Sequence, residues 1–243
     1  PDSYKDHADA MRAWHTARPD RLQCQTGWVG RAADYACNQC GLDVPVVFVS
    51  EIAQPFSLNA ETAIIPSVNR LEDCGLRIVS DSGGEQSCRE KITELARLPR
   101  ADTGNPLLSS LKDRAVKAHK FNKRIEAILQ SNATSVQYPP YQLAEKLRTT
   151  AQLIRADVGI RIIHTELGGA GFGGFDNHAN QRGNHGALLR QLSDSVAAFV
   201  EDLQRDKRLD RVLLMTFSEF GRTVKENGRR GTGHGAAAPM FLV

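Results

Sequence analysis

The run VPVVFVSE, Val44–Glu51, is short, largely apolar, rich in β-branched residues and bounded by a proline. These features predict a buried strand, because β-branched side chains pack well on a pleated surface and proline commonly marks a strand end. The elements that follow along the chain indicate which kind of sheet this strand joins.

Two amphipathic helices are predicted in the middle of the chain. From Leu107 onward, apolar residues recur at intervals of three and four, as in a long amphipathic helix. Pro139 and Pro140 interrupt this pattern and suit the entry into a second helix. The predicted apolar faces comprise Leu108, Leu111, Ala115, Ala118, Ile125, Ile128 and Leu129 in the first helix, and Leu143, Leu147, Ala151 and Ile154 in the second.

Strands and a helix alternate toward the end of the chain. GIRIIHTEL (159–167) and DRVLLMTFSE (210–219) are predicted strands, APMFLV (238–243) begins another, and residues 184–205 have a helical pattern. The apolar stripe of that helix is Leu188, Leu192, Val196, Phe199 and Leu203. Apolar strands that alternate with helices are typical of a parallel sheet covered by helices, so we expect an α/β fold with a mostly parallel central sheet.

The composition suits one globular domain over residues 1–243, with 41% hydrophobic and 24% charged residues. Residues 20–105 are expected to form a loop-rich, cysteine-containing region with a short helix from Glu85 to Leu98. The chain stops inside its last apolar run, so we expect a fragment or a partial gene. It has no run of about 18 apolar residues that would predict a membrane span, and its first residues do not resemble an export signal.

The charge pattern argues against a nucleic-acid partner. The net charge is only +3, and basic residues are interspersed with acidic ones. The densest basic stretch, Lys112–Arg124, lies on the polar side of a predicted helix, with few aromatic residues to stack on bases. We interpret it as a solvated helix face.

The cysteines indicate disulfides more than a metal site. They are Cys24, Cys37, Cys40, Cys74 and Cys88. Cys37-x-x-Cys40 suits half a zinc site or a redox pair, but no second C-x-x-C or H-x-x-x-H follows. We therefore favour one or two disulfides, with at least one thiol left over because the number is odd.

The stretch HTELGGAGFGGFDNHANQ, His164–Gln181, contains a glycine loop in which Gly169, Gly171 and Gly174 satisfy G-x-G-x-x-G. A dinucleotide site also needs a helix that opens at the last glycine and an acidic residue at the end of the next strand. The residues after Gly174 have poor helix propensity, and Asp194, at the required spacing, falls within a predicted helix. We therefore expect no nucleotide cofactor.

Polar residues follow the predicted strands where ligands bind in α/β sheets, beyond the carboxyl ends. Asp176 and His178 follow one strand, Glu219 ends the next, and His234 precedes the last. In DNH, Asp176 and His178 can point the same way from an extended backbone. Two imidazoles and two carboxylates can bind Zn²⁺, Mn²⁺ or a similar ion. The alternative is a set of unrelated polar loop residues.

Three motifs resemble those of the bacterial domain-of-unknown-function 1501 family. LGG…FDNHANQ, LLMTFSEFGRTVKENG and GTGHG stand in the order and spacing of GGWDTHxNQ, T-x-SEFGR-x-x-x-N and GTDHG in that family. GWVGRAADY, Gly27–Tyr35, is similar to an upstream G-W-x-x-R element. The resemblance covers most of the chain, and its specific part is Glu166–Gly235.

This resemblance implies membership of the alkaline phosphatase and sulfatase superfamily. The fold would be a three-layer α/β/α domain with one or two metal ions at its strand ends, and the protein would be exported to the periplasm or cell envelope. The implied ligands of a divalent metal, with Zn or Mn favoured, are Asp176, His178, Glu219 and His234.

Several departures from the family pattern suggest a reduced or altered second metal site. Gly233 stands where the family commonly has an aspartate, and Phe220 where many superfamily members have a second histidine. Phe175 replaces a tryptophan after an expanded glycine loop. In the superfamily, the first strand carries a metal-binding aspartate and a nucleophile follows it. Nothing before Pro1 supplies that part, so no nucleophile is assigned.

The expected function is metal-dependent hydrolysis of a phosphate or sulfate ester, either of a small anionic molecule or of a cell-envelope component. Arg222 would contact the anion through its guanidinium, or alternatively pair with Glu226 one turn along. Ser218 and Asn227 are candidates to orient the metal ligands through hydrogen bonds. The alternative function is a non-catalytic relative, a binding or assembly module with a degenerate metal site.

Other polar residues near these motifs are assigned no function. His164 and Glu166 alternate with Thr165 and so face one side of the sheet, in a core or edge position. Asn184 is expected to cap the following helix, next to His185. Exposed helix surfaces are expected to carry His7, His15 and His119.

Overall fold

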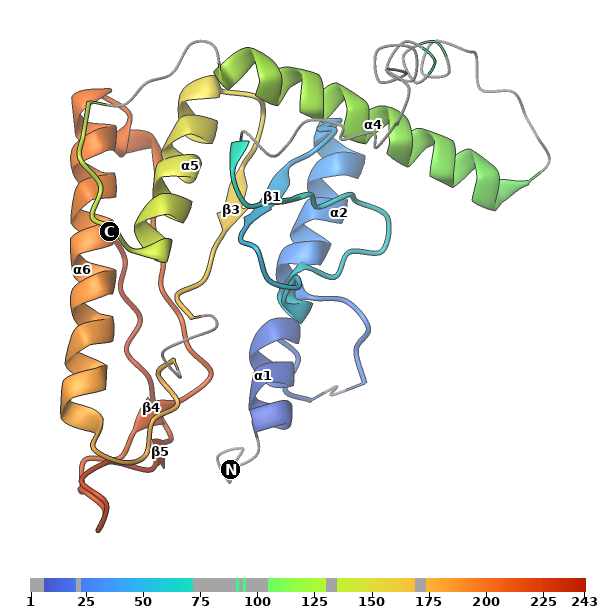
Figure 1. The fold of residues 1–243 in the computed structure, drawn as a ribbon. Helices are drawn as coiled ribbons and strands as arrows, with labels where there is room; N and C mark the ends of the chain where they lie inside the picture. The colour runs from blue at the N-terminus through green and yellow to red at the C-terminus, as the bar shows by residue number, and fades with distance from the viewer. Residues whose placement is uncertain are drawn as a thin grey trace, which may run out of the picture.

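A small parallel sheet lies between the helices of the molecule (Figure 1). The computed structural model describes residues 7–20, 23–71, 91, 94, 105–129, 135–168 and 174–243. The strands follow the order β2 (Ser67–Val68), β1 (Val46–Val49) and β3 (Ile162–His164), and all are parallel. The predicted strand of Val44–Glu51 is therefore the middle strand, and the expected mixed α/β class with a parallel sheet is confirmed.

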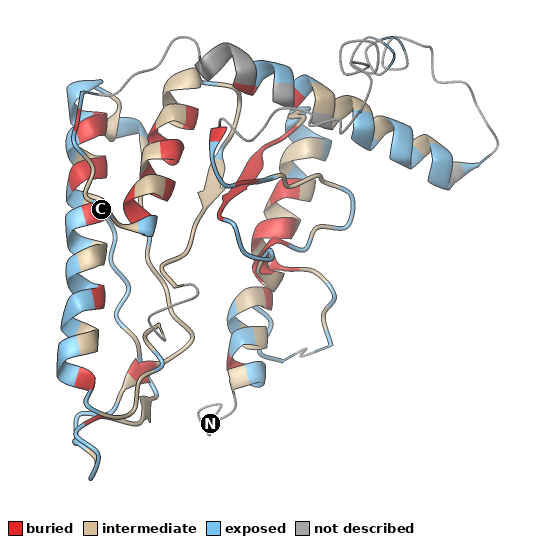
Figure 2. Ribbon diagram, in the orientation of Figure 1, coloured by how far each residue is buried: buried red, intermediate tan, exposed pale blue. Residues whose placement is uncertain are grey.

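Helices cover both faces of this sheet (Figure 1). Alternate residues of a strand point to opposite faces. Val46 and Phe48 pack against α2, whereas Val47 and Val49 pack against α4 and α5, so the whole of β1 is buried (Figure 2). The α-helices of the described residues are α1 (His7–Thr16), α2 (Trp28–Cys40), α4 (Pro106–Leu129), α5 (Gln142–Ala156) and α6 (Gln181–Arg205).

The predicted apolar faces of α5 and α6 meet each other. Their shared core consists of Leu143, Leu147, Ala151, Phe199 and Leu203. At one end of this contact, the Tyr138 hydroxyl donates a hydrogen bond of 2.8 Å to Asp202, and Arg155 forms ion pairs with Asp202 and Asp206. Buried charged groups need partners. Asp202 and Arg155 are paired with each other, although Arg155 Nη1 is buried without a hydrogen-bond partner among the described residues.

Helix α4 extends beyond the sheet (Figure 1). Phe121 and Ile125, near its C-terminal end, are buried against β1 and α5, whereas Leu108 and Leu111 are 41% and 55% exposed. The predicted helix is confirmed, and its apolar side is buried at Ile125 but exposed at Leu108 and Leu111. Only the last turns cross the sheet, so nothing among the described residues covers the first ones.

Helix α1 is fixed against α2 and the 3₁₀ helix η1 (Phe56–Leu58) by two arginines. The guanidinium of Arg12 lies 4.1 Å from the ring centroid of Phe56, and Arg31 donates a hydrogen bond of 2.7 Å to the Thr16 carbonyl. In the element Gly27–Tyr35, a side chain at Gly27 would collide with the Ser57 carbonyl. This element therefore has a structural role in joining α1, α2 and η1.

The end of the chain differs from the prediction. DRVLLMTFSE begins with a 3₁₀ helix, η3 (Leu209–Arg211), and its extended part is not a strand of the parallel sheet. Instead, Leu214 exchanges two backbone hydrogen bonds of 2.9 Å with Val243, and Met215 forms an antiparallel bridge with Leu242. The apolar run APMFLV thus provides the backbone hydrogen bonds of this segment, which a neighbouring strand of the parallel sheet was expected to provide.

Two local expectations are also corrected. Helix α6 begins at Gln181, and Asn180, in the left-handed region with φ 47°, precedes it. Asn184 is therefore inside the helix, where its side chain donates a 3.5 Å hydrogen bond to the Gly174 carbonyl. The thiols of Cys24, Cys37 and Cys40 are free, so the expected disulfides do not involve these three residues.

Some expectations lie outside the described residues. They concern Cys74, Cys88, Gly169, Gly171 and, apart from Lys91 and Glu94, the helix from Glu85 to Leu98. Within the part of the chain that is described, no helix is long and apolar enough to cross a membrane.

Candidate metal centre

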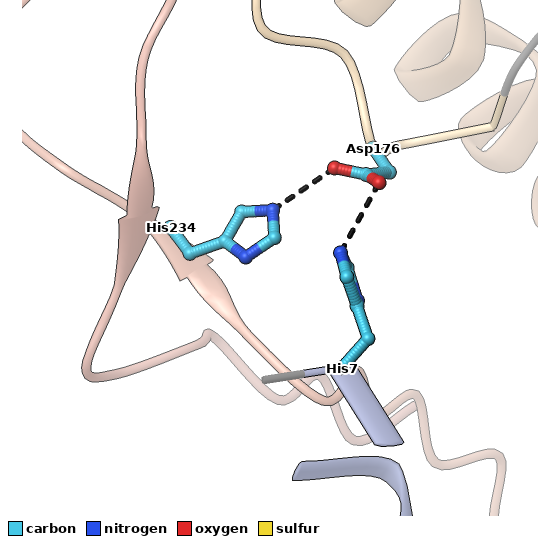
Figure 3. Close-up of side chains that lie close together, drawn as sticks. All are labelled: His7, Asp176 and His234. Carbon is cyan, nitrogen blue, oxygen red and sulfur yellow. Dashed lines mark hydrogen bonds and ion pairs between the residues drawn. The ribbon is translucent and has the colours of Figure 1, made fainter. Parts of the chain in front are cut away.

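The carboxylate of Asp176 lies among three imidazoles. Its Oδ1 is 2.9 Å from His234 Nε2 and 2.8 Å from His178 Nε2, and its Oδ2 is 3.2 Å from His7 Nε2. Figure 3 shows His7 and His234 on either side of this carboxylate. The hydrogen bond from His234 lowers the pKa of Asp176, against the smaller opposing effect of burial. Three of the four predicted metal ligands therefore meet at one point.

The backbone determines which nitrogen of His178 carries a proton. His178 Nδ1 lies 2.9 Å from the carbonyl oxygen of Thr232, which can only accept, so Nδ1 donates. In the neutral ring, Nε2 then directs a lone pair at Asp176 Oδ1, 2.8 Å away. Two lone pairs at this distance repel each other unless a proton or a cation lies between them. Either a proton on His178 Nε2 or a cation bound between the two residues satisfies this contact.

Glu219, the fourth predicted ligand, joins the cluster through His7. Its Oε1 lies 3.5 Å from His7 Nδ1, while the other nitrogen of that ring faces Asp176. His7 is the first residue of α1, and its side chain, which was expected on an exposed helix surface, is 43% exposed and contacts both carboxylates. No local motif surrounds it in the sequence, so only the packing of α1 could reveal it.

Aromatic and cationic side chains border the cluster. The ring of Phe220 stacks on His234, with centroids 3.9 Å apart and planes inclined by 10°. Arg222 Nη2 lies 3.8 Å from Asp176 Oδ1 and also donates to the Phe175 carbonyl, while its Nη1 donates to the Thr232 carbonyl at 3.1 Å. Arg222 therefore supplies positive charge next to Asp176 and holds the backbone of two motifs together.

The three motifs interlock through hydrogen bonds, several of which are made by Asn227. Its amide donates a 3.0 Å hydrogen bond to the His178 carbonyl, and its Oδ1 accepts one of 3.1 Å from Gly231 N. Thr232 donates a hydrogen bond of 2.6 Å to Gln181 Oε1. Asn227, a predicted orienting residue, thus contacts the backbone that carries a candidate ligand.

Close backbone approach brings Arg222 and His234 together. They lie opposite each other in a two-stranded antiparallel ladder, β4 (Gly221–Arg222) with β5 (His234–Gly235). A side chain at Gly231 would collide with the His178 carbonyl. At Gly233, where an aspartate was expected, a Cβ atom would lie 3.6 Å from Thr223 Cγ2, an ordinary contact. The backbone therefore has room for a side chain at Gly233.

A second polar cluster lies at the carboxyl ends of β1 and β3. Lys146, which is 4% exposed, forms an ion pair with Glu166, and the Ser50 hydroxyl donates a 2.8 Å hydrogen bond to the same carboxylate. Burial lowers the pKa of His164 to about 4, an effect to which nearby His15 adds. His164 and Glu166, which were assigned no function, thus lie at the sheet end where ligands bind in α/β folds.

Two cavities adjoin these residues. One, of about 830 Å³, is lined by His178, Glu219 and His234. The other, of about 1140 Å³, is lined by Asp176, Ser218, Glu219 and Arg222, and also by His164 and Glu166 of the sheet end. Ser218, the other predicted orienting residue, thus borders the larger cavity.

Comparison with known proteins gives one result. A family model described as "Protein of unknown function (DUF1501)" matches residues 94–243, more than half of the chain. The match includes all three motifs that converge on Asp176, whereas the Gly27–Tyr35 element lies before it. No curated protein and no solved structure matches the chain.

Proposed function

The chain belongs to the DUF1501 family, and from this premise we propose that it is a metal-dependent hydrolase of phosphate or sulfate monoesters with an alkaline phosphatase-like three-layer fold. The single observation that carries the proposal is the cluster of His7, Asp176 and His234, whose ligand atoms all lie within 4.8 Å of one another. Two neutral imidazoles and a carboxylate are typical ligands of catalytic zinc, which keeps a further position open.

The ligand atoms lie close enough together to share one ion after a small outward shift. Ligand atoms of a tetrahedral zinc site are separated by about 3.3 Å, as follows from bonds of about 2.0 Å. The contacts from Asp176 to His178, His234 and His7 are 2.8, 2.9 and 3.2 Å. The Thr232 carbonyl accepts a hydrogen bond from His178 Nδ1, which leaves Nε2 facing the site. Such an outer hydrogen bond is usual for a histidine that binds metal.

The neighbouring residues suit an anionic substrate. An ion held here would polarise the ester oxygen and stabilise the leaving oxygen. Arg222 adds a second positive charge beside Asp176, and Asn227 and Thr232 hold the segment of His178 in place. The Phe220 ring restricts the rotation of His234 by stacking on it.

Metal titration of the purified chain tests the proposal. We expect one Zn²⁺ or Mn²⁺ per chain by calorimetry, and hydrolysis of phosphate or sulfate esters only with the ion. Loss of an outer hydrogen-bond partner of a zinc ligand typically weakens binding about ten- to a hundredfold. Removal of a ligand in Asp176→Asn or His178→Ala should therefore weaken binding by at least about a hundredfold.

The controls separate the interpretations. His119→Ala, on α4, removes a histidine outside the cluster and should leave the affinity unchanged. His7→Ala should weaken binding, because His7 bridges Asp176 and Glu219. If the folded chain binds no divalent ion, the result contradicts the proposal and favours a non-catalytic binding module. Metal binding without ester hydrolysis would support the metal site and contradict the proposed hydrolase activity.

A further inference from the structure

The cavity of about 830 Å³ beside the candidate metal centre combines one polar end with an apolar body. Among the described residues that line it, the titratable side chains are His178, Glu219 and His234. These are three of the four predicted metal ligands. The rest of the lining is aromatic, aliphatic or thioether, as in pockets that hold an apolar ligand group next to a few convergent polar groups.

The packing of α1 creates the space. Ala10 and Ala13 lie three residues apart on α1 and Ala17 directly follows the helix, so this segment presents small side chains to the cavity. Across it, the rings of Trp14 and Phe217 stack with centroids 6.2 Å apart and planes inclined by 22°. Together with Phe220 on His234, these rings give the cavity flat apolar walls that reach the ligand cluster.

We infer that this cavity binds the alcohol portion of the ester, and that this portion is apolar and ring-bearing rather than a sugar. The inference rests on the proposed function, whose reacting group would lie at His178 and His234. A sugar needs hydrogen-bond partners for its hydroxyl groups, and unpaired buried hydroxyls are unfavourable. Apolar rings, by contrast, gain from burial against tryptophan and phenylalanine.

Two matched esters test the substrate class. Benzyl phosphate and glucose 6-phosphate both release a primary alcohol, so they differ in recognition more than in chemical reactivity. We expect kcat/KM of the metal-loaded chain to be at least about tenfold higher for benzyl phosphate, from burial of the ring. Benzyl sulfate and glucose 6-sulfate, run in parallel, should show the same preference if the anion is sulfate. Equal or faster hydrolysis of the glucose ester overturns the inference and leaves the hydrolase function intact.

Binding of an analogue separates the two proposals. The chain has only two tryptophans, and both Trp14 and Trp28 line this cavity, so intrinsic fluorescence reports on its occupancy. Benzylphosphonate, which is not hydrolysed, should change this fluorescence and bind at least about tenfold more tightly than methylphosphonate in calorimetry. If it does so although no ester is cleaved, the hydrolase proposal fails while the apolar pocket stands.

A variant pair locates the binding site. Ala13→Leu narrows the cavity and should weaken benzylphosphonate binding at least about tenfold, by displacing the ring. Methylphosphonate binding should not change, which also shows that the variant is folded. Ala8→Leu, at an exposed position of the same helix outside the lining, is the matched control. Unchanged benzylphosphonate affinity in Ala13→Leu, or no fluorescence response in the unmodified chain, overturns the inference.

Discussion

Asn227 donates a 3.0 Å hydrogen bond to the backbone carbonyl of His178, so the segment after β4 holds the segment that carries a candidate metal ligand. The same side chain accepts a hydrogen bond from Gly231 N. Three motifs that are separate in the sequence are thereby joined through one amide. The positions of His178 and His234 depend on these hydrogen bonds of Asn227, and the first prediction tests this dependence.

Gly231→Ala should disrupt the hydrogen bonds of Asn227 that connect the motifs. The new methyl group would collide with the His178 carbonyl, which cannot move without breaking the bond from Asn227. We expect a loss of roughly 2 kcal/mol in the free energy of unfolding and weaker metal binding. Gly228→Ala is the matched control, because a Cβ there meets nothing within 4 Å. Urea denaturation measures the stability of both variants, and equal stabilities would contradict the prediction.

Gly233→Asp should strengthen the metal site. The Cβ atom fits beside Thr223, and a carboxylate there lies next to His234 in the chain, where it can bind the ion or orient the imidazole. We expect Zn²⁺ affinity to rise by about tenfold, measured by competition with a chelator. Gly233→Asn has nearly the same size without the charge and should give a smaller gain. If both variants bind alike, the missing carboxylate is not what distinguishes this site.

His164 should make the protein less stable in acid. Burial lowers its pKa to about 4 in the folded chain, from an unfolded value of about 6.5. Between these pH values the unfolded chain takes up a proton that the folded chain does not, so stability falls as the pH drops from about 6.5 to 4 and changes no further through this group below that. The contribution is roughly 3 kcal/mol.

The comparison of two chains isolates this effect. In His164→Gln the side chain does not titrate, so its stability should fall less than that of the unmodified chain between pH 7 and pH 4. Urea denaturation at both pH values measures the free energy of unfolding of each chain. The contributions of the other titratable groups cancel when the two chains are compared. The same pH dependence in both chains would show that His164 is protonated as readily in the folded state as in the unfolded one.

Lys146→Met should be strongly destabilising. It leaves the Glu166 carboxylate, which is 22% exposed, without its ion-pair partner at the end of the sheet. Breaking such a pair costs roughly 3 kcal/mol or more. Adding Glu166→Leu should restore much of that loss, since no charge then remains unpaired. Arg148→Met, which breaks an exposed pair with Glu145, should change stability by less than about 1 kcal/mol.

Local patterns in the sequence correctly predict the elements whose burial depends on their own residues. Val46, Val47, Phe48 and Val49 are apolar on both faces of β1, and such a strand is stable only between two layers. The stripes of α5 and α6 have the helical period and meet in one core. Asp176, His178 and His234 lie next to predicted strands, in motifs that resemble those of one family, and from this the sequence indicated that they share one site.

The tertiary structure alone decides which distant segments meet. His7 enters the cluster because Arg12 and Arg31 fix α1 beside it, and no periodicity or motif near His7 encodes that contact. The segment after η3 pairs with the last residues of the chain. An extended apolar run can pair with any strand that provides hydrogen-bond partners for its backbone N–H and C=O groups. Composition and spacing determine what each segment can become, whereas packing decides which side chains share a site.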